Sequence, residues 1–80
     1  MSAEDVFEVD ERFLPIATLQ AVSDYMQAKD QHKFVSNLLV KKKVAKKSDY
    51  DFEQTVREAD DMLSALSLRV VHDFLTQTRH

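Results

Sequence analysis

The chain has 80 residues, which is enough for one small domain at most. It has no cysteine and only three histidines, so it offers neither a disulfide framework nor a cysteine-based zinc site. It also has no glycine, where about 7% is usual, and this argues against the glycine-rich loops that cradle phosphates. With 44% apolar residues and a single proline, the composition predicts an all-α fold. We expect a small three- to four-helix bundle with a long C-terminal helix.

The net charge of −3 is unevenly distributed along the chain. Residues 1–28 carry one Arg against six acids, residues 29–47 carry seven Lys against one Asp, and residues 48–80 carry three Arg against seven acids. The acidic total argues against a protein dedicated to binding duplex nucleic acid, but it leaves open a local basic contact.

The first residues are acidic and have no apolar core, so we expect no signal peptide. No apolar run approaches the length of a membrane span. Together with the lack of cysteine, these features predict a cytoplasmic protein with no membrane span. Because the sequence contains no catalytic motif, metal motif or phosphate-binding loop, we also expect no cofactor and no small-molecule substrate.

Residues 1–13 are interpreted as an acidic N-terminal arm, and residues 14–80 as a single helical domain. Apolar and acidic residues alternate from Phe7 to Val9, as they would in a short strand. The arm is too short to be stable alone. It is therefore either loose or docks its phenylalanines, Phe7 and Phe13, elsewhere.

The first helix is expected to begin at Pro15, because proline suits the first helical position. It should end near residues 29–31, where charged residues interrupt the apolar face and Asp30 can cap the next helix. A single continuous helix over residues 15–47 is the alternative. The predicted apolar face consists of Ile16, Leu19, Val22 and Met26.

The second helix is predicted over residues 31–46, and its apolar side is formed by Phe34, Val35, Leu38 and Leu39. Its end is strongly basic, and we call the basic residues there the lysine cluster: Lys41, Lys42, Lys43, Lys46 and Lys47. Lysines are favourable at a helix C-terminus, which is the plainest interpretation. The alternatives are contact with an acidic partner, with nucleic acid or with an anionic membrane.

A helix-turn-helix interpretation of residues 18–41 is also available, with the turn near residues 29–31. That turn lacks glycine, and short helix pairs occur in every helical bundle. We therefore rank this interpretation below the bundle.

The third helix, predicted over residues 51–78, gives the strongest pattern in the chain. Ser48 and Asp51 have the spacing of a capping box before it. Seven apolar residues recur at intervals of three or four and fall within about 80° of one another on a helical wheel. This seam consists of Phe52, Val56, Ala59, Leu63, Leu66, Val70 and Phe74.

The second part of the third helix has a further apolar face, formed by Leu68, Val71 and Leu75. A straight helix of this length spans about 42 Å, whereas a compact domain of this size is about 30 Å across. Either the helix breaks near residues 64–67, or the molecule is elongated and something covers the excess length. A second copy of the chain is the simplest cover.

No arrangement of polar residues predicts catalysis or metal binding. His72 and Asp73 point about 100° apart on a helix, and the pair Asp60 and Asp61 is expected to be solvated. We therefore expect a protein that is not an enzyme.

The sequence predicts a non-enzymatic protein–protein interaction module: a small regulator, adaptor or inhibitor. Its partner would be another protein, a second copy in a homodimer, or both. The predicted interface residues are Leu63, Leu66, Leu68, Val71, Phe74 and Leu75. The alternative is a regulator that binds nucleic acid through the lysine cluster.

Overall fold

The computed structural model describes residues 9–78, and its elements are helical throughout. A 3-10 helix, η2 (Glu11–Ile16), precedes three α-helices: α1 (Leu19–Gln27), α2 (Gln31–Lys41) and α3 (Phe52–Thr78). The all-α prediction is thus confirmed. The strand-like pattern that starts at Phe7 lies outside the described residues.

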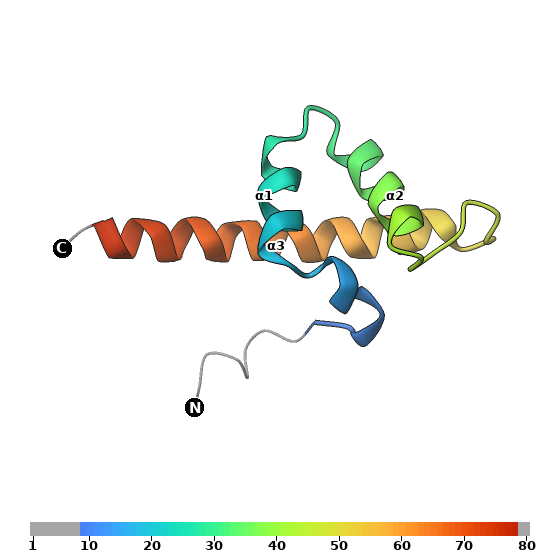
Figure 1. The fold of residues 1–80 in the computed structure, drawn as a ribbon, viewed down its shortest axis with the longest axis horizontal. Coiled ribbons are helices and arrows are strands. Elements are labelled where there is room, and N and C mark those ends of the chain that lie inside the picture. The colour runs from blue at the N-terminus through green and yellow to red at the C-terminus, as the bar shows by residue number, and fades with distance from the viewer. Residues whose placement is uncertain (1–8, 79–80) are drawn as a thin grey trace.

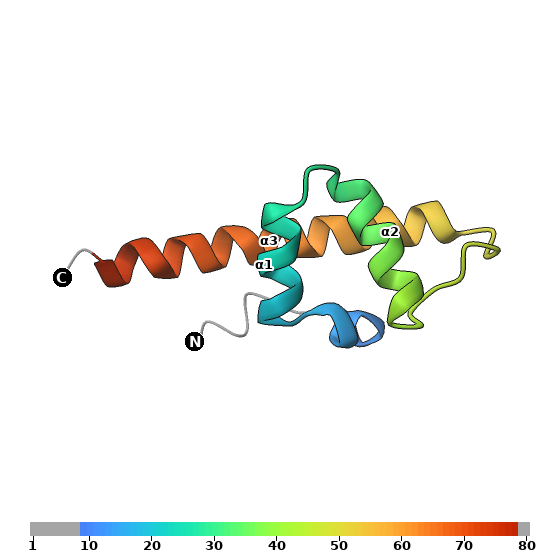
Figure 2. The same cartoon turned by 45° about the horizontal axis from the view of Figure 1, so that its top comes forward.

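The long helix α3 is the axis of the molecule (Figure 1). Helices α1 and α2 both cross it and pack against it, and the turned view in Figure 2 shows the same arrangement. The principal extents of 49 × 31 × 16 Å describe an elongated molecule. Of the two alternatives left by the length estimate, the structure adopts the straight helix. The Ser67 hydroxyl donates to the Leu63 carbonyl at 2.7 Å, within an unbroken α3.

The first helix does not begin at Pro15, as the sequence predicted. Pro15 lies inside η2, and α1 begins at Leu19 with Thr18 as its N-cap, whose hydroxyl accepts from the Ala21 amide at 3.1 Å. A residue and its third neighbour align on a 3-10 helix, so η2 directs both Phe13 and Ile16 into the core. This short helix therefore anchors the end of the predicted arm.

The break before α1 also changes which of its faces is buried. Leu19 and Met26 were expected in the core, but both are exposed. Because the backbone changes direction between η2 and α1, residues 15 and 16 do not continue the helical wheel of α1. The face of α1 that is buried therefore cannot be read from a wheel that starts at Pro15. Its buried residues are Ala21, Val22 and Tyr25.

Helix α2 begins as predicted, because the Asp30 carboxylate accepts from the Lys33 amide at 3.0 Å. The predicted apolar side also packs, with Val35 and Leu39 buried. A continuous helix over residues 15–47 is excluded by the extended backbone between α1 and α2.

The end of α2 comes five residues before the predicted one. Lys43 has a φ of 60°, the left-handed conformation in which glycine is usual. Its amide donates to the Val40 carbonyl at 3.1 Å, and the Val44 amide donates to the Leu39 carbonyl at 2.9 Å. This pair of bonds closes the helix and places Val44 against the core. Lys43 thus occupies a position where glycine is usual, in a chain that contains no glycine.

The start of α3 lies one residue after the predicted one, but the proposed capping box is absent. Ser48 lies four residues before the first helical residue, Phe52, and is therefore too far away to cap it. The buried Thr55 hydroxyl instead donates to the Asp51 carbonyl at 3.2 Å.

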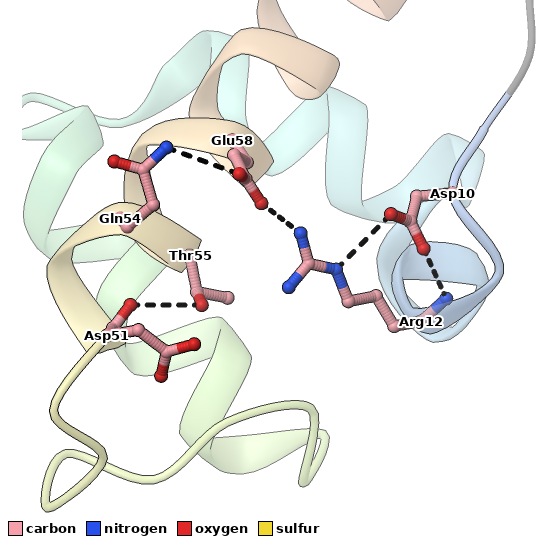
Figure 3. Close-up of polar contacts among 6 residues, drawn as sticks. All are labelled: Asp10, Arg12, Asp51, Gln54, Thr55 and Glu58. Atoms are coloured by element: carbon pink, nitrogen blue, oxygen red, sulfur yellow. Dashed lines mark hydrogen bonds and ion pairs between the residues drawn. The ribbon is translucent and has the colours of Figure 1, made fainter.

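Polar contacts attach η2 to α3 (Figure 3). The Arg12 guanidinium bonds to the Glu58 carboxylate of α3 and to Asp10 at 3.3 Å, and it lies 4.6 Å from the centre of the Phe13 ring. Gln54 donates to the other oxygen of Glu58 at 3.2 Å. Arg12 therefore connects η2 to the second turn of α3.

Candidate functional site: the C-terminal stripe of α3

The two parts of α3 differ in their surroundings. Residues 52–66 lie under α1, α2 and η2, and their side chains Val56, Ala59 and Leu63 are completely buried. The last turns of α3 project beyond α1, and no other described element lies beside them (Figures 1 and 2). The predicted seam is therefore covered by the chain's own residues from Phe52 to Leu66, with Val70 partly buried against the core and Phe74 exposed.

The projecting part keeps large apolar side chains in solvent. We call these residues the C-terminal stripe: Leu68, 71% exposed, Val71, 40%, Phe74, 62%, and Leu75, 56%. On a helical wheel they fall within about 120° of one another, so they form one face. None of the four carries a charge, and the nearby Arg69 and Asp73 pair with each other at 3.9 Å on the opposite side of the helix.

The structure separates the six predicted interface residues into two groups. Leu63 is completely buried in the chain's own core, and Leu66 is half-buried against it. The other four are the C-terminal stripe. Leu63 is therefore inaccessible to a partner, whereas the stripe is accessible to one.

A hollow of about 290 Å³ adjoins the stripe, in the angle between α1 and α3. We call it the α1–α3 hollow. Two small side chains, Ser64 and Ser67, leave room on the α3 side. The complete lining is Tyr25, Met26, Gln31, Ser64, Ser67, Leu68 and Val71.

One wall of this hollow is held by a polar contact that the sequence did not reveal. The Tyr25 hydroxyl donates to the Asp60 carboxylate at 2.8 Å, and the Gln31 amide donates to the Tyr25 carbonyl at 3.1 Å. Burial first, and the bond to Asp60 second, raise the pKa of Tyr25 to about 12. Asp60 was expected to be solvated beside Asp61. A tyrosine and an acid 35 positions apart carry no local signal of their pairing.

The lysine cluster lies at the other end of the molecule. Lys41 ends α2, and the other four lysines lie in the loop before α3, so a helix C-terminus explains only part of the cluster. All five side chains are exposed, and none forms an ion pair with another residue in the described part of the chain. Asp49 is nearby, but its carboxylate accepts from the Lys46 backbone amide at 3.0 Å.

Comparison with known proteins identifies no relative: no family model, no characterised protein and no solved structure matches this chain.

A metal-binding cluster is not found in residues 9–78. No group of three or more His, Cys, Asp or Glu side chains there could hold a metal ion. His32 contacts Glu53 at 3.2 Å, but both side chains are mostly exposed. Within the same residues, no helix is long and apolar enough to cross a membrane.

Proposed function

We propose that this protein is a non-enzymatic interaction module, a small regulator, adaptor or inhibitor, that binds a protein partner through the C-terminal stripe. The observation that carries this proposal is the exposure of four large apolar side chains on one face of a projecting helix. Contiguous apolar surface of this kind is typical of interaction sites, because leaving it in water is unfavourable. The expected cytoplasmic location stays a prediction.

The form of the surface supports helix-to-helix recognition. Leu68, Val71 and Leu75 lie at positions i, i+3 and i+7 of α3, which is the spacing of anchors on a helix that docks in a groove or against another helix. The adjacent α1–α3 hollow extends the surface onto the body of the molecule. A large aromatic side chain, Phe74, lies within the stripe, and aromatic residues are enriched at the centres of interfaces.

The test compares the wild-type chain with Phe74→Ser in quantitative affinity purification from cells of the source organism. Phe74 lies outside the core, so the variant should keep its helical circular dichroism. His72→Gln is the matched control, because His72 is exposed on the polar side of the same turn. The proposal expects a partner retained by the wild type and the control but lost in Phe74→Ser. Equal recovery with all three chains would overturn it.

A second candidate function is nucleic-acid binding through the lysine cluster. It is favoured by five exposed positive charges at one end of the molecule, none of them in an ion pair with another described residue. It predicts an affinity whose logarithm falls linearly with the logarithm of salt concentration, with a slope reduced by about one for each lysine changed to alanine. Failure to retard both DNA and RNA at low salt would remove this candidate.

A further inference from the structure

We infer that the occupant of the C-terminal stripe is a second copy of the same chain, paired antiparallel about a two-fold axis near Val71. The inference rests on the proposed function, because it names the partner of the same surface. Three observations support it: the distribution of large and small side chains along α3, the apolar area that is available, and the absence of charge on the stripe.

The stripe and the hollow are arranged as complementary halves on either side of Val71. The small residue Ser67 lies four positions before Val71, and the exposed Leu75 lies four positions after it. Leu68, which is also large and exposed, precedes Val71 by three positions, and Phe74 follows it by three. In an antiparallel pair centred on Val71, the Phe74 and Leu75 end of one copy therefore lies opposite the Ser67 and Leu68 end of the other.

In this pairing, the α1–α3 hollow of one copy accommodates the Phe74 side chain of the other. Phe74 is the largest side chain of the stripe, and the hollow has space beside Ser64 and Ser67, with Met26 as its apolar rim. Both copies place a Phe74 in the hollow of the other at the same time. Such an interface uses the same patch on both subunits and closes, whereas a knob and hollow without this symmetry would generate an open chain.

The shape of the molecule permits the pairing. The overlapping segments are residues 64–78 of each copy, and the packed bodies then lie at opposite ends of the helix pair. In Figure 1, the end of α3 projects clear of α1, α2 and η2, so a second helix can lie along it and meet only α1, at the α1–α3 hollow. A parallel partner helix would instead bring the two bodies to the same end.

The available area is close to the lower limit for a specific dimer. The four stripe residues and Met26 have side chains of about 150–200 Å² each, and their exposed fractions leave about 450 Å² per copy. Complete burial of these side chains in both copies removes about 900 Å² of apolar surface from water, which is close to the roughly 1,000 Å² that a specific interface needs.

Charge is also compatible with self-pairing. No stripe residue is charged, so two identical stripes do not repel each other, and no acidic or basic partner is selected by them. The only charged side chains on the described part of this segment, Arg69 and Asp73, pair on the opposite side of the helix. Apolar residues also form the central seam of paired helices.

The experiment uses the full chain, whose lack of cysteine allows single cysteines to report on geometry. Mass is measured by light scattering from about 1 µM to about 1 mM, which covers dissociation constants within that range. Val71→Cys and Ser64→Cys are then treated separately with a short bis-maleimide. In the antiparallel pair, the thiols of two Val71→Cys chains meet, whereas those of two Ser64→Cys chains are about 21 Å apart along the axis.

The inference expects a concentration-dependent dimer, crosslinking through Val71→Cys but not Ser64→Cys, and a monomer in Phe74→Ser with helical content retained. His72→Gln should dimerise like the wild type. Crosslinking at both cysteine positions would indicate a parallel pair and overturn the geometry, and a dimer unaffected by Phe74→Ser would place the contact elsewhere. A monomer at every concentration would overturn the inference that a second copy occupies the stripe. The proposed function would survive that last result if a different protein were lost only with Phe74→Ser.

Discussion

The two parts of α3 have similar apolar content but different surroundings. In residues 52–66, the apolar seam is buried by α1, α2 and η2. In residues 67–78, the apolar side chains of the stripe remain in solvent. A helical pattern therefore reports that a face will be covered, but not what covers it. Residues within the first part should govern folding, and those within the second should govern binding.

The largest expected effect is on the free energy of unfolding, and it distinguishes the two parts of α3. Leu63→Ala should lower the free energy of unfolding by about 2–5 kcal/mol, because Leu63 is completely buried and its truncation leaves a cavity. Leu68→Ala, a matched change further along the helix and mostly exposed, should cost the monomer less than about 0.5 kcal/mol. Urea denaturation at low protein concentration measures both. Equal losses would contradict the division of α3.

The next effect concerns the boundary between the two parts, where α1 is fastened to α3. Tyr25→Phe removes the hydrogen bond to Asp60 and should lower the free energy of unfolding by about 1 kcal/mol near neutral pH. Tyr50→Phe is the control, because Tyr50 is fully exposed. If Tyr25→Phe and Tyr50→Phe have the same free energy of unfolding, the hydrogen bond contributes nothing to stability.

The same tyrosine predicts a dependence of stability on alkaline pH. The folded pKa of Tyr25, about 12, lies above the unfolded value of 10.0, so folding favours the protonated form. Its contribution is complete below pH 10 and is lost as the pH rises from 10 towards 12, where the unfolded chain releases the proton first. Denaturation of the wild type and Tyr25→Phe across this range should give curves that converge. Parallel curves would contradict the shift.

A smaller effect of opposite sign is expected at the loop that leads into the packed part. Lys43→Gly should raise the free energy of unfolding by about 0.5–1 kcal/mol, because glycine adopts the left-handed conformation without steric cost. Lys42→Gly, at the preceding position with a φ of −89°, should instead be neutral or destabilising. Thermal denaturation distinguishes the pair, and destabilisation by Lys43→Gly would refute the assignment of strain.

The smallest effect is at the contact between η2 and the packed part. Arg12→Gln should cost about 0.5 kcal/mol, because both Arg12 and Glu58 are partly exposed and solvent screens their attraction. The loss should shrink at high salt. A loss that is independent of salt would assign the effect to packing of the Arg12 stem on Phe13 instead.

The sequence alone was sufficient for the helical class, the start of α2 at its Asp30 cap and the seam of α3. These features depend on local chemistry: a carboxylate that accepts from a nearby amide, and apolar residues spaced to lie on one helical face. The predicted start of the first α-helix at Pro15 was wrong, because proline suits a 3-10 helix as well as an α-helix. The 3-10 helix is the form that buries Phe13 and Ile16 together in the core.

Three further features were decided by the tertiary structure. The bond from Tyr25 to Asp60 joins residues distant in sequence, and the left-handed Lys43 ends α2 where Val44 can reach the core. The third is the division of α3. Periodicity identifies an apolar face, but its burial depends on where α1 and α2 cross the helix, and the last turns of α3 project beyond them. For that reason Leu63 belongs to the core, while the C-terminal stripe remains available to a partner.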